Sequence, residues 1–594
     1  MSRLLQGGRD LSDLHGWIRT TSTLALLATG LSACSDSAST AVTSSQPCGS
    51  ASVVQLSVLQ ATTFDCSSGG EIQLAGGGAQ YLIVPEFAAG DVSDVSTSYV
   101  LSDSDALSAP ASGVVAARVP TANFGAALPT QSVRGAGMLQ LRFDRALRAV
   151  EREAVAKGSW AHGTNAPRSS MRASVTPQPA VVPPEGSIRT FRVISTFSVQ
   201  NPAYTTVNAK LQYVGANTLV YLDTLSPPNG FTSTQLNAFG QMIDQTFYTI
   251  DVNEFGPPSD IDGNGRVIVL LSPVVNAITP ASQCATDGYV AGFFYGFDLS
   301  SNSSNSNQGE IYYGLVPDPT GKFSCAHSVS SVESIAAGTF LHELQHMISY
   351  SQHVIVHGAA AEEGWLDEGM SIFAQELGSL YYEQKFPSPT GRTNPAQLLP
   401  DSAEGFIADQ FEESFAYAQR PDTSSLTLHS DADGGLTWRA GDWLFLHWLG
   451  DQKGASFYKN LEQSTLTGTA NIAAQAGEPF QSLFGDFGLA LYTDSIPGVP
   501  KSSIPQRDQF TTRTLRTIWQ AVFNAGGSGS SSPFPIAVKT LSGKITASMV
   551  PGAVSYYEIF TSSSKPNTTV RFAPPSGGTF NSDLHPQVSV FRLQ

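Results

Sequence analysis

The chain has 594 residues, enough at about 150 residues per domain for roughly three or four domains and a sizeable core. Asp and Glu (49) outnumber Lys and Arg (32), and the resulting net charge of −17 argues against binding to nucleic acid, which depends on basic residues that displace counterions. Charged residues make up 14% of the chain and hydrophobic residues 41%, which excludes wholesale disorder and a repetitive fibre.

The beginning of the chain has the pattern of an export signal. Arg9 and Arg19 precede an apolar stretch at 23–31, and the sequence Leu-Ser-Ala-Cys then ends at Cys34. These four residues resemble the bacterial lipobox, in which the signal is removed before the cysteine and the thiol receives a lipid. The pattern therefore predicts a lipoprotein signal peptide over 1–33; a plain secretory signal with an incidental cysteine is the alternative.

The location follows from the same segment. The apolar stretch is far shorter than the roughly 18 residues of a membrane-spanning helix, so we expect membrane contact only through a lipid on Cys34. Ser35 stands where lipoproteins retained in the inner membrane of enteric bacteria have Asp, which favours the outer membrane. The expected location is the bacterial cell envelope, lipid-anchored, or else the exterior after secretion.

Four further cysteines predict disulfide bonds. An even number of thiols in an exported chain is typical of disulfide pairing. Four cysteines allow three pairings, and the pairing of sequence neighbours closes the shorter loops. We therefore expect Cys48 to pair with Cys66, and Cys284 with Cys325.

Composition divides the chain into segments. After a small, polar tether, β-prone runs alternate with Gly- and Ser-rich turns, and a helix is predicted at 139–155. A Pro-rich stretch and a Gly/Ser-rich joint mark later boundaries. The expected segments are the signal peptide (1–33), a tether (34–51), an N-terminal β-rich module (52–155), a Pro-rich linker (156–187), a large mixed domain (188–525), a Gly/Ser linker (526–533) and a C-terminal β module (534–594).

The large domain mixes helices and strands. Strands are predicted at 190–194, 218–222 and 266–271, with a helical pattern at 233–249 between the second and the third. The alternation predicts a mixed α and β architecture.

A short acidic loop precedes the third of these strands. Asp260, Asp262 and Asn264 occupy the first three ligand positions of a calcium loop and Gly265 its sharp turn. Leu271 stands where such a loop has its bidentate glutamate. Bound Ca²⁺ is thus conceivable, but an ordinary turn is favoured.

The residues that carry chemistry are concentrated between Glu333 and Glu368. A helix is predicted at 330–352, and Ser330 and Glu333 at its start have the spacing of a capping box. The helix contains the motif HExxH at 342–346. Two imidazoles four positions apart project from one helical face and can share a zinc ion. The glutamate between them can hold a water molecule, accept its proton during attack on a carbonyl and pass the proton to the leaving group.

A catalytic zinc site needs a third protein ligand. The extended motif HExxHxxGxxH is excluded, because Ser349 and Gln352 stand where it has Gly and His. His353 and His357 are conceivable ligands, but they fall at or past the end of the helix, where a solvent-facing or turn position is favoured. Glu368 is the stronger candidate, because a loop and a second, antiparallel helix could return its carboxylate to the metal.

HELQHMISY at 342–350, followed by WLDEGMS at 365–371, resembles the gluzincin metallopeptidases, and the pairing is most similar to the hyicolysin family. The specific match covers about residues 330–380. The resemblance implies that the large domain at 188–525 is an α+β zincin-type metallopeptidase domain with a mixed sheet and a helical lower half. The strand patterns of the sequence add all-β modules on its N-terminal and C-terminal sides. The resemblance also implies one catalytic Zn²⁺ held by His342, His346 and Glu368, with Glu343 as the catalytic base.

Two departures qualify the resemblance. Ile372 stands where the thermolysin pattern has an Asp that orients a ligand histidine, so Ser371 or Asp367 could serve in its place. The aminopeptidase pattern includes a GxMEN-type loop that binds the substrate amino terminus, and the sequence has no such loop, which favours an endopeptidase.

Other roles are assigned only in part. The run at 310–316 is a candidate for the sheet edge that a substrate strand would extend, with an internal strand as the alternative. The residue that stabilises the oxyanion is unknown, since Tyr381, Tyr382, Tyr417 and His429 each fit a structural role better. His447, in an apolar helix pattern, is expected to be a core residue.

The sequence thus predicts a zinc-dependent endopeptidase that hydrolyses peptide bonds in extracellular or periplasmic proteins. Its expected partner is a protein or peptide substrate and not a nucleic acid. Two alternatives remain: an inactive, protease-like surface-binding lipoprotein, and a zinc amidohydrolase acting on a non-protein substrate.

Overall fold

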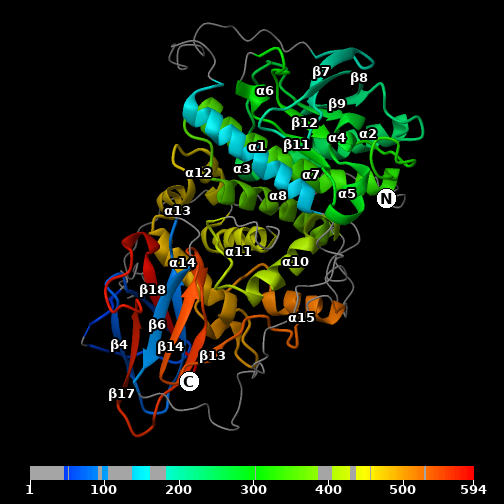
Figure 1. Ribbon diagram of the computed structural model, residues 1–594. Coiled ribbons are helices and arrows are strands. Elements are labelled where there is room, and N and C mark those ends of the chain that lie inside the picture. Colours follow the sequence, from blue (N-terminus) through cyan, green and yellow to red (C-terminus); the bar gives the residue numbers. More distant parts are fainter. Residues whose placement is uncertain are drawn as a thin grey trace, which may run out of the picture. The chain divides into compact units, whose positions relative to one another are not determined.

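The computed structural model describes ten stretches of the chain (Figure 1), at 46–50, 52–90, 96–104, 137–160, 182–300, 303–385, 404–428, 436–454, 456–526 and 530–594. The predicted signal peptide, Cys34 and His429 lie outside these residues. No helix in the described stretches is both long enough and apolar enough to cross a bilayer.

Two sheets are built from strands at both ends of the chain. One has the order β1-β3-β18-β5-β16-β13, with β15 also paired to β5, and the other has the order β14-β6-β17-β4-β2. The strands are β1 (Gln46–Pro47), β2 (Val53–Val54), β3 (Ala61–Asp65), β4 (Gly70–Ala75), β5 (Gln80–Phe87), β6 (Thr97–Asp103), β13 (Lys539–Thr540), β14 (Lys544–Met549), β15 (Ala553–Val554), β16 (Tyr557–Phe560), β17 (Asn567–Ala573) and β18 (Pro586–Arg592).

This pairing differs from the expectation of two separate β modules. β18 lies between β3 and β5, and β17 lies between β4 and β6, so that blue and red strands alternate in Figure 1. Side chains of both segments, such as Tyr99 and Tyr557, share one buried cluster. Each segment alone would leave one face of its strands without a partner, and the two together bury it.

A third sheet belongs to the mixed domain. Its order is β11-β12-β10-β9-β8-β7, parallel between β9, β10 and β12 and antiparallel elsewhere. The strands are β7 (Ile188–Ile194), β8 (Tyr204–Val214), β9 (Thr218–Asp223), β10 (Val267–Leu271), β11 (Gly292–Phe294) and β12 (Ile311–Gly314). The run that we considered for the edge contains β12, which is internal because β11 pairs with its outer side. The edge strand on this side of the sheet is β11, and the opposite edge is β7.

Helices make up most of the remaining described chain. They are α1 (Met138–Lys157), α2 (Ser233–Met242), α3 (Tyr248–Phe255), α4 (Pro273–Ile278), α5 (Ala281–Asp287), α6 (Phe297–Ser300), α7 (Val329–Tyr350), α8 (Gly364–Lys385), α10 (Glu404–Gln419), α11 (Leu436–Lys453), α12 (Ser456–Glu462), α13 (Gly468–Ala476), α14 (Phe480–Thr493) and α15 (Leu515–Ala525). Two π-helical segments, Ile243–Phe247 and Ser351–Val356, continue α2 and α7. The predicted mixed α+β character is confirmed.

The N-terminus of α7 differs in detail from the prediction. The capping residue is Ser328, whose side chain accepts a hydrogen bond from the Ser331 N–H, so the helix begins two residues before the predicted capping box. α7 is buried along most of its length and packs against α8 and the edge strand β11. α7 therefore lies between the mixed sheet and α8.

The predicted helix at 139–155 is confirmed as α1, which ends where Gly158 takes a left-handed conformation. Its apolar side chains Phe143 and Leu147 are fully buried in the core of the mixed domain. Although it precedes the Pro-rich linker in sequence, α1 packs with the mixed domain and contacts α8.

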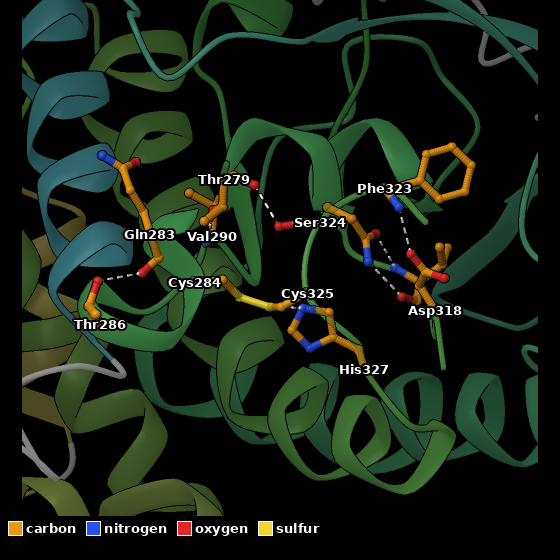
Figure 2. The surroundings of a disulfide bond; sticks show 12 residues. Thr279, Gln283, Cys284, Thr286, Val290, Asp318, Phe323, Ser324, Cys325 and His327 are labelled. Atoms are coloured by element: carbon orange, nitrogen blue, oxygen red, sulfur yellow. Dashed lines mark hydrogen bonds between the residues drawn. A yellow bond between two sulfur atoms is a disulfide. The ribbon is translucent and has the colours of Figure 1, made fainter. Parts of the chain in front are cut away.

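The predicted disulfide pairing is confirmed. Cys48 pairs with Cys66, with Cα atoms 4.9 Å apart, and Cys284 pairs with Cys325, with Cα atoms 6.0 Å apart. Figure 2 shows the second disulfide, with His327 beside Cys325. Since the disulfide takes both thiols, this Cys and His group is not available as a thiolate metal site.

Candidate metal centre

α7 brings the two histidines of the HExxH motif together. The Nε2 atoms of His342 and His346 lie 3.2 Å apart, one helical turn from each other. His346 is 1% exposed and His342 8% exposed. Two ring nitrogens at this distance need a shared proton or cation between them, because their lone pairs otherwise repel.

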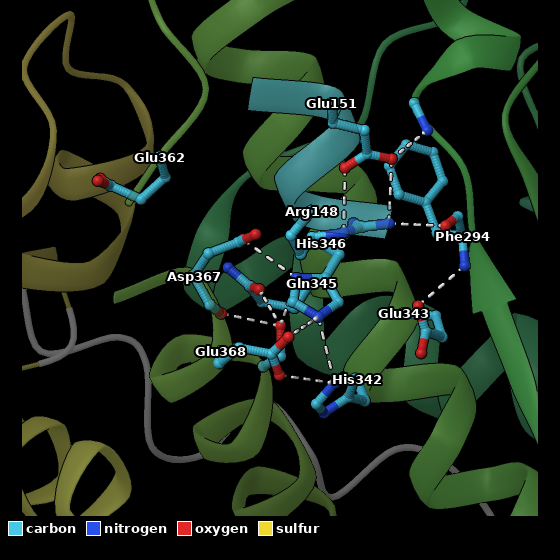
Figure 3. A network of polar contacts seen from close by, with 12 residues as sticks. Arg148, Glu151, Phe294, His342, Glu343, Gln345, His346, Glu362, Asp367 and Glu368 are labelled. Carbon is cyan, nitrogen blue, oxygen red and sulfur yellow. Dashed lines mark hydrogen bonds and ion pairs between the residues drawn. The ribbon is translucent and has the colours of Figure 1, made fainter. Parts of the chain in front are cut away.

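α8 adds the carboxylate of Glu368 to this pair (Figure 3). Its Oε2 atom lies 3.6 Å from His342 Nε2, and its Oε1 atom lies 3.8 Å from His346 Nε2. Glu368 is 1% exposed, and neither carboxylate oxygen has a hydrogen-bond partner among the described residues. Burial alone would raise the pKa of Glu368, but the neighbouring His342 and His346 outweigh it and lower the pKa to about 2.

The three donor groups fit a zinc ion. Tetrahedral ligands at about 2.0–2.1 Å from zinc lie about 3.3 Å from one another, close to the three separations found here. A buried carboxylate without hydrogen-bond donors is costly unless a cation accompanies it. The donor set of two imidazole nitrogens and one carboxylate oxygen is one that zinc prefers.

A second layer of contacts orients His346. Its Nδ1 atom lies 3.0 Å from Ser371 Oγ and 3.1 Å from Asp367 Oδ1. The Ser371 hydroxyl donates to Gln345 Oε1 at 2.5 Å, so its oxygen is free to accept from the ring. A proton held on Nδ1 leaves the lone pair on Nε2, the atom that faces Glu368. Both residues considered for this role in the sequence are therefore in contact with the ring.

Glu343 lies beside the donor triangle rather than in it. Its Oε2 atom accepts a hydrogen bond from the Phe294 N–H of β11 at 2.8 Å, whereas Oε1 is buried and has no partner within the described part of the chain. Burial, with the nearby Asp144, raises the pKa of Glu343 well above its usual range. The edge strand thus holds one oxygen of this carboxylate and leaves the other available.

Four polar residues of α1 face the same region and were not predicted. Gln140, Asp144, Arg148 and Glu151 recur at helical spacing on one side of α1, and the last three are buried. Arg148 pairs with Glu151 and donates to the Phe294 carbonyl (Figure 3). The sequence does show this polar stripe beside the apolar residues of the helix. It does not indicate which part of the chain the stripe contacts.

Other histidines take structural positions. His353, for which a solvent-facing or turn position was favoured, is fully buried in the π-helical segment, with its Nε2 atom 3.7 Å from Glu362 and from Glu462. The π-helical continuation of α7 keeps its ring inside the core. His357 is exposed. His447 is a core residue, as predicted, and contacts Glu376.

The structure does not bring the described tyrosine candidates to the metal cluster. Tyr381 and Tyr382 follow Glu368 by 13 and 14 positions on α8, which is about 20 Å along a helix axis. Tyr382 packs against Phe247 and Phe406, and Tyr417 is buried in the helical core. The group that stabilises an oxyanion therefore stays unassigned.

Comparison with known proteins gives one distant metalloprotease relative for part of the chain. No family model matches the chain. The neutral metalloprotease ShpI of Staphylococcus hyicus is 26% identical over 238 residues, which cover 36% of this chain and 50% of that protease. The chain thus spans about half the length of this relative. The similarity supports a distant metalloprotease relationship for part of the chain.

Proposed function

We propose that the chain is a zinc-dependent endopeptidase of the gluzincin type. The observation that carries the proposal is the buried triangle of His342, His346 and Glu368, whose donor atoms converge while the carboxylate has no hydrogen-bond donor in the described chain. These three residues would hold one zinc ion. Glu343 would be the catalytic base.

A zinc ion held by His342, His346 and Glu368 would supply Lewis-acid chemistry, polarising the scissile carbonyl and lowering the pKa of water to about 7. Glu343 would accept a proton from the attacking water on Oε1 and deliver it to the leaving amine. The hydrogen bond from the Phe294 N–H fixes the other oxygen, so that the carboxylate keeps its orientation during both transfers. Asp367 and Ser371 would keep the His346 ring in the tautomer that presents Nε2.

The proposal is tested by cleavage of casein in the presence and absence of a zinc chelator, with zinc content measured on the same samples. Glu343→Gln should retain zinc and lose about 10²–10⁴-fold in cleavage rate, the usual contribution of a general base. Glu333→Gln, on the same helix but partly exposed, is the matched control and should change neither quantity. A Glu343→Gln protein that cleaves at the native rate would rule out the proposed base.

The same experiment separates the alternatives. An inactive surface-binding lipoprotein would show no cleavage with zinc bound, and an amidohydrolase would leave casein intact but cleave a non-protein amide from a substrate panel. The absence of a GxMEN-type loop from the sequence supports internal cleavage over removal of terminal residues. The expected substrates are proteins or peptides outside the cytoplasm.

The lipobox at the start of the chain supports attachment to the bacterial envelope through a lipid on Cys34. The mass of the mature N-terminal peptide tests this directly. A diacylglyceryl-modified Cys34 is expected, and an unmodified peptide beginning at another residue would indicate simple secretion.

A further inference from the structure

The acidic loop before β10 meets a buried carboxylate from elsewhere in the chain. Within the loop, the Gly265 N–H donates to Asp260 and the Asn264 N–H donates to Asp262, as expected of a tight turn. Glu310, the residue before β12, brings a carboxylate oxygen within 4.8 Å of oxygens of Asp260 and Asp262. Position 271, where a calcium loop has its glutamate, is a buried leucine, and Glu310, just before the neighbouring strand β12, supplies a carboxylate instead.

Glu310 is what separates this cluster from an ordinary acidic turn. Its side chain is buried (1% exposed). Oε1 accepts hydrogen bonds from Ser259 Oγ at 2.6 Å and from the Ile261 N–H at 3.0 Å, but Oε2 is buried without a partner in the described stretches. A buried carboxylate oxygen left without a donor is costly unless a cation lies against it.

The donor chemistry points to a hard cation. All three side chains offer oxygen, and oxygens of one calcium shell, at 2.3–2.6 Å from the ion, lie up to about 5 Å apart. Arg189 pairs with one of the three carboxylates, its Nη1 atom lying 3.8 Å from Asp262 Oδ2. Nitrogen and sulfur donors are absent from the cluster, which disfavours zinc.

We propose that Asp260, Asp262 and Glu310 bind one calcium ion, separate from the catalytic metal. The ion would join the loop after α3 to the start of β12. Since β10 and β12 are adjacent in the mixed sheet, calcium would stabilise the part of the sheet that supports β11.

Calcium titration of the zinc-loaded protein tests the site. We expect one additional binding event, a melting temperature raised by several degrees, and loss of both in Glu310→Gln. Asp583→Asn, at an exposed acid just before β18, is the control and should bind calcium as the native protein does. Asp262→Asn covers the case in which Glu310→Gln does not fold. Absence of binding at millimolar calcium, or binding unchanged in both loop variants, would overturn the proposal.

A second, independent observation concerns the edge strand. α1 takes several backbone groups in and beside β11. Gln140 donates to the Gly292 carbonyl at 2.8 Å and accepts from the Ala291 N–H at 2.6 Å. Arg148 donates to the Phe294 carbonyl at 2.7 Å, and Glu151 accepts from the Gly296 N–H at 2.6 Å, while the Phe294 N–H donates to Glu343 of α7. A peptide that extends this sheet would need the same groups.

The same face of α1 also reaches the metal centre. Asp144 has a carboxylate oxygen within 4.8 Å of donor atoms of His342 and Glu343, and Gln140 holds that carboxylate by hydrogen bonds at 2.8 and 2.9 Å. Gln140 and Asp144 therefore occupy the space that a bound peptide would need.

We infer that α1 is an inhibitory segment that holds the site closed, an inference that rests on the proposed peptidase function. The double variant Gln140→Ala/Asp144→Ala keeps the apolar anchors Phe143 and Leu147. Loss of the hydrogen bond from the Ala291 N–H to Gln140, just before β11, should raise hydrogen exchange at the Ala291 amide by about tenfold. Glu153→Ala, on the exposed face of α1, should leave exchange unchanged.

Peptide cleavage by the same variant shows whether α1 blocks substrate binding or forms one side of the working site. Cleavage several-fold faster than in the native protein is expected. Unchanged exchange, or faster exchange with slower cleavage, would overturn the inference and make α1 part of the working site. Exchange at the Ala291 amide could rise in the variant while neither the native protein nor the variant cleaves any peptide with zinc bound. That result would contradict the proposed peptidase function but not the contact between α1 and the region of β11.

Discussion

Two glutamates on α8, two helical turns apart, show how burial can serve different ends. Glu368 and Glu376 are both almost fully buried, and the pKa of each is lowered to about 2 by neighbours that outweigh burial. Glu376 receives hydrogen bonds from Trp443 Nε1 at 2.6 Å, from His447 at 2.8 Å and from Arg513. Glu368 receives none in the described chain and faces the two ring nitrogens of α7.

The contrast separates a structural carboxylate from a candidate ligand. Glu376 has the donors that a buried anion needs and ties α8 to α11 and to the segment before α15. Glu368 lacks them; its neighbours are the rings of His342 and His346, and a cation bound between the three groups would balance the buried charge. Exposure and pKa do not distinguish the two residues; the hydrogen-bond partners do.

The largest effect is expected from Glu368→Ala. Loss of one of three ligands should reduce bound zinc below one per chain and peptide cleavage by on the order of a thousandfold, while the metal-free protein should unfold at no lower temperature than the native apoprotein. Zinc content by atomic absorption and casein cleavage check this. Full zinc occupancy in the variant would show that Glu368 is not a ligand.

Glu376→Gln should lower the stability of the fold and leave zinc binding unchanged. Removing the charge beside Arg513 and His447 should lower the free energy of unfolding by about 3–5 kcal/mol, as for other broken buried ion pairs, with zinc stoichiometry unchanged. Urea unfolding measures the change. Glu383→Gln, whose contact with Arg513 is partly exposed, is the control and should cost less than about 1 kcal/mol.

The contribution of Glu376 to the free energy of unfolding should depend on pH in one direction. Its folded pKa of about 2 is below its ordinary value of 4.5, so its stabilisation is present above about pH 4.5 and is lost as the pH falls towards 2. The difference in unfolding free energy between the native protein and Glu376→Gln should therefore shrink between pH 5 and pH 3. A difference that stays constant over this range would contradict the assignment.

A smaller effect is expected from the groups behind His346. Asp367→Asn should weaken zinc affinity by about 10–100-fold, because the ring loses the acceptor that fixes its tautomer. Ser371→Ala should have a weaker effect of the same kind. Competition with a zinc-binding dye measures both. Native affinity in Asp367→Asn would show that the contact at 3.1 Å does not orient the ring.

The three candidate metal ligands could be predicted from the sequence because they lie close together along the chain. His342 and His346 meet through helical periodicity alone, and Glu368 follows after one loop and one helix start. The two disulfides were readable for the same reason, since each joins neighbouring cysteines. Short-range geometry, set by the helix repeat and by loop length, leaves few alternatives at these positions.

The missed features depend on contacts between distant parts of the chain. Glu86 of β5 accepts a hydrogen bond from Gln587 of β18, 501 positions away. No local sequence pattern indicates that the two β-rich segments share sheets. The polar stripe of α1 likewise meets β11 about 150 positions later. The edge strand itself has only three residues, too few for periodicity to indicate.

Anomalous diffraction at the zinc edge, on crystals of the purified protein, tests the central claim most directly. We predict one strong peak at about 2.0–2.1 Å from the Nε2 atoms of His342 and His346, with a Glu368 oxygen completing the set of protein ligands. A peak held by other residues, or none in a protein that cleaves peptides, would contradict the account.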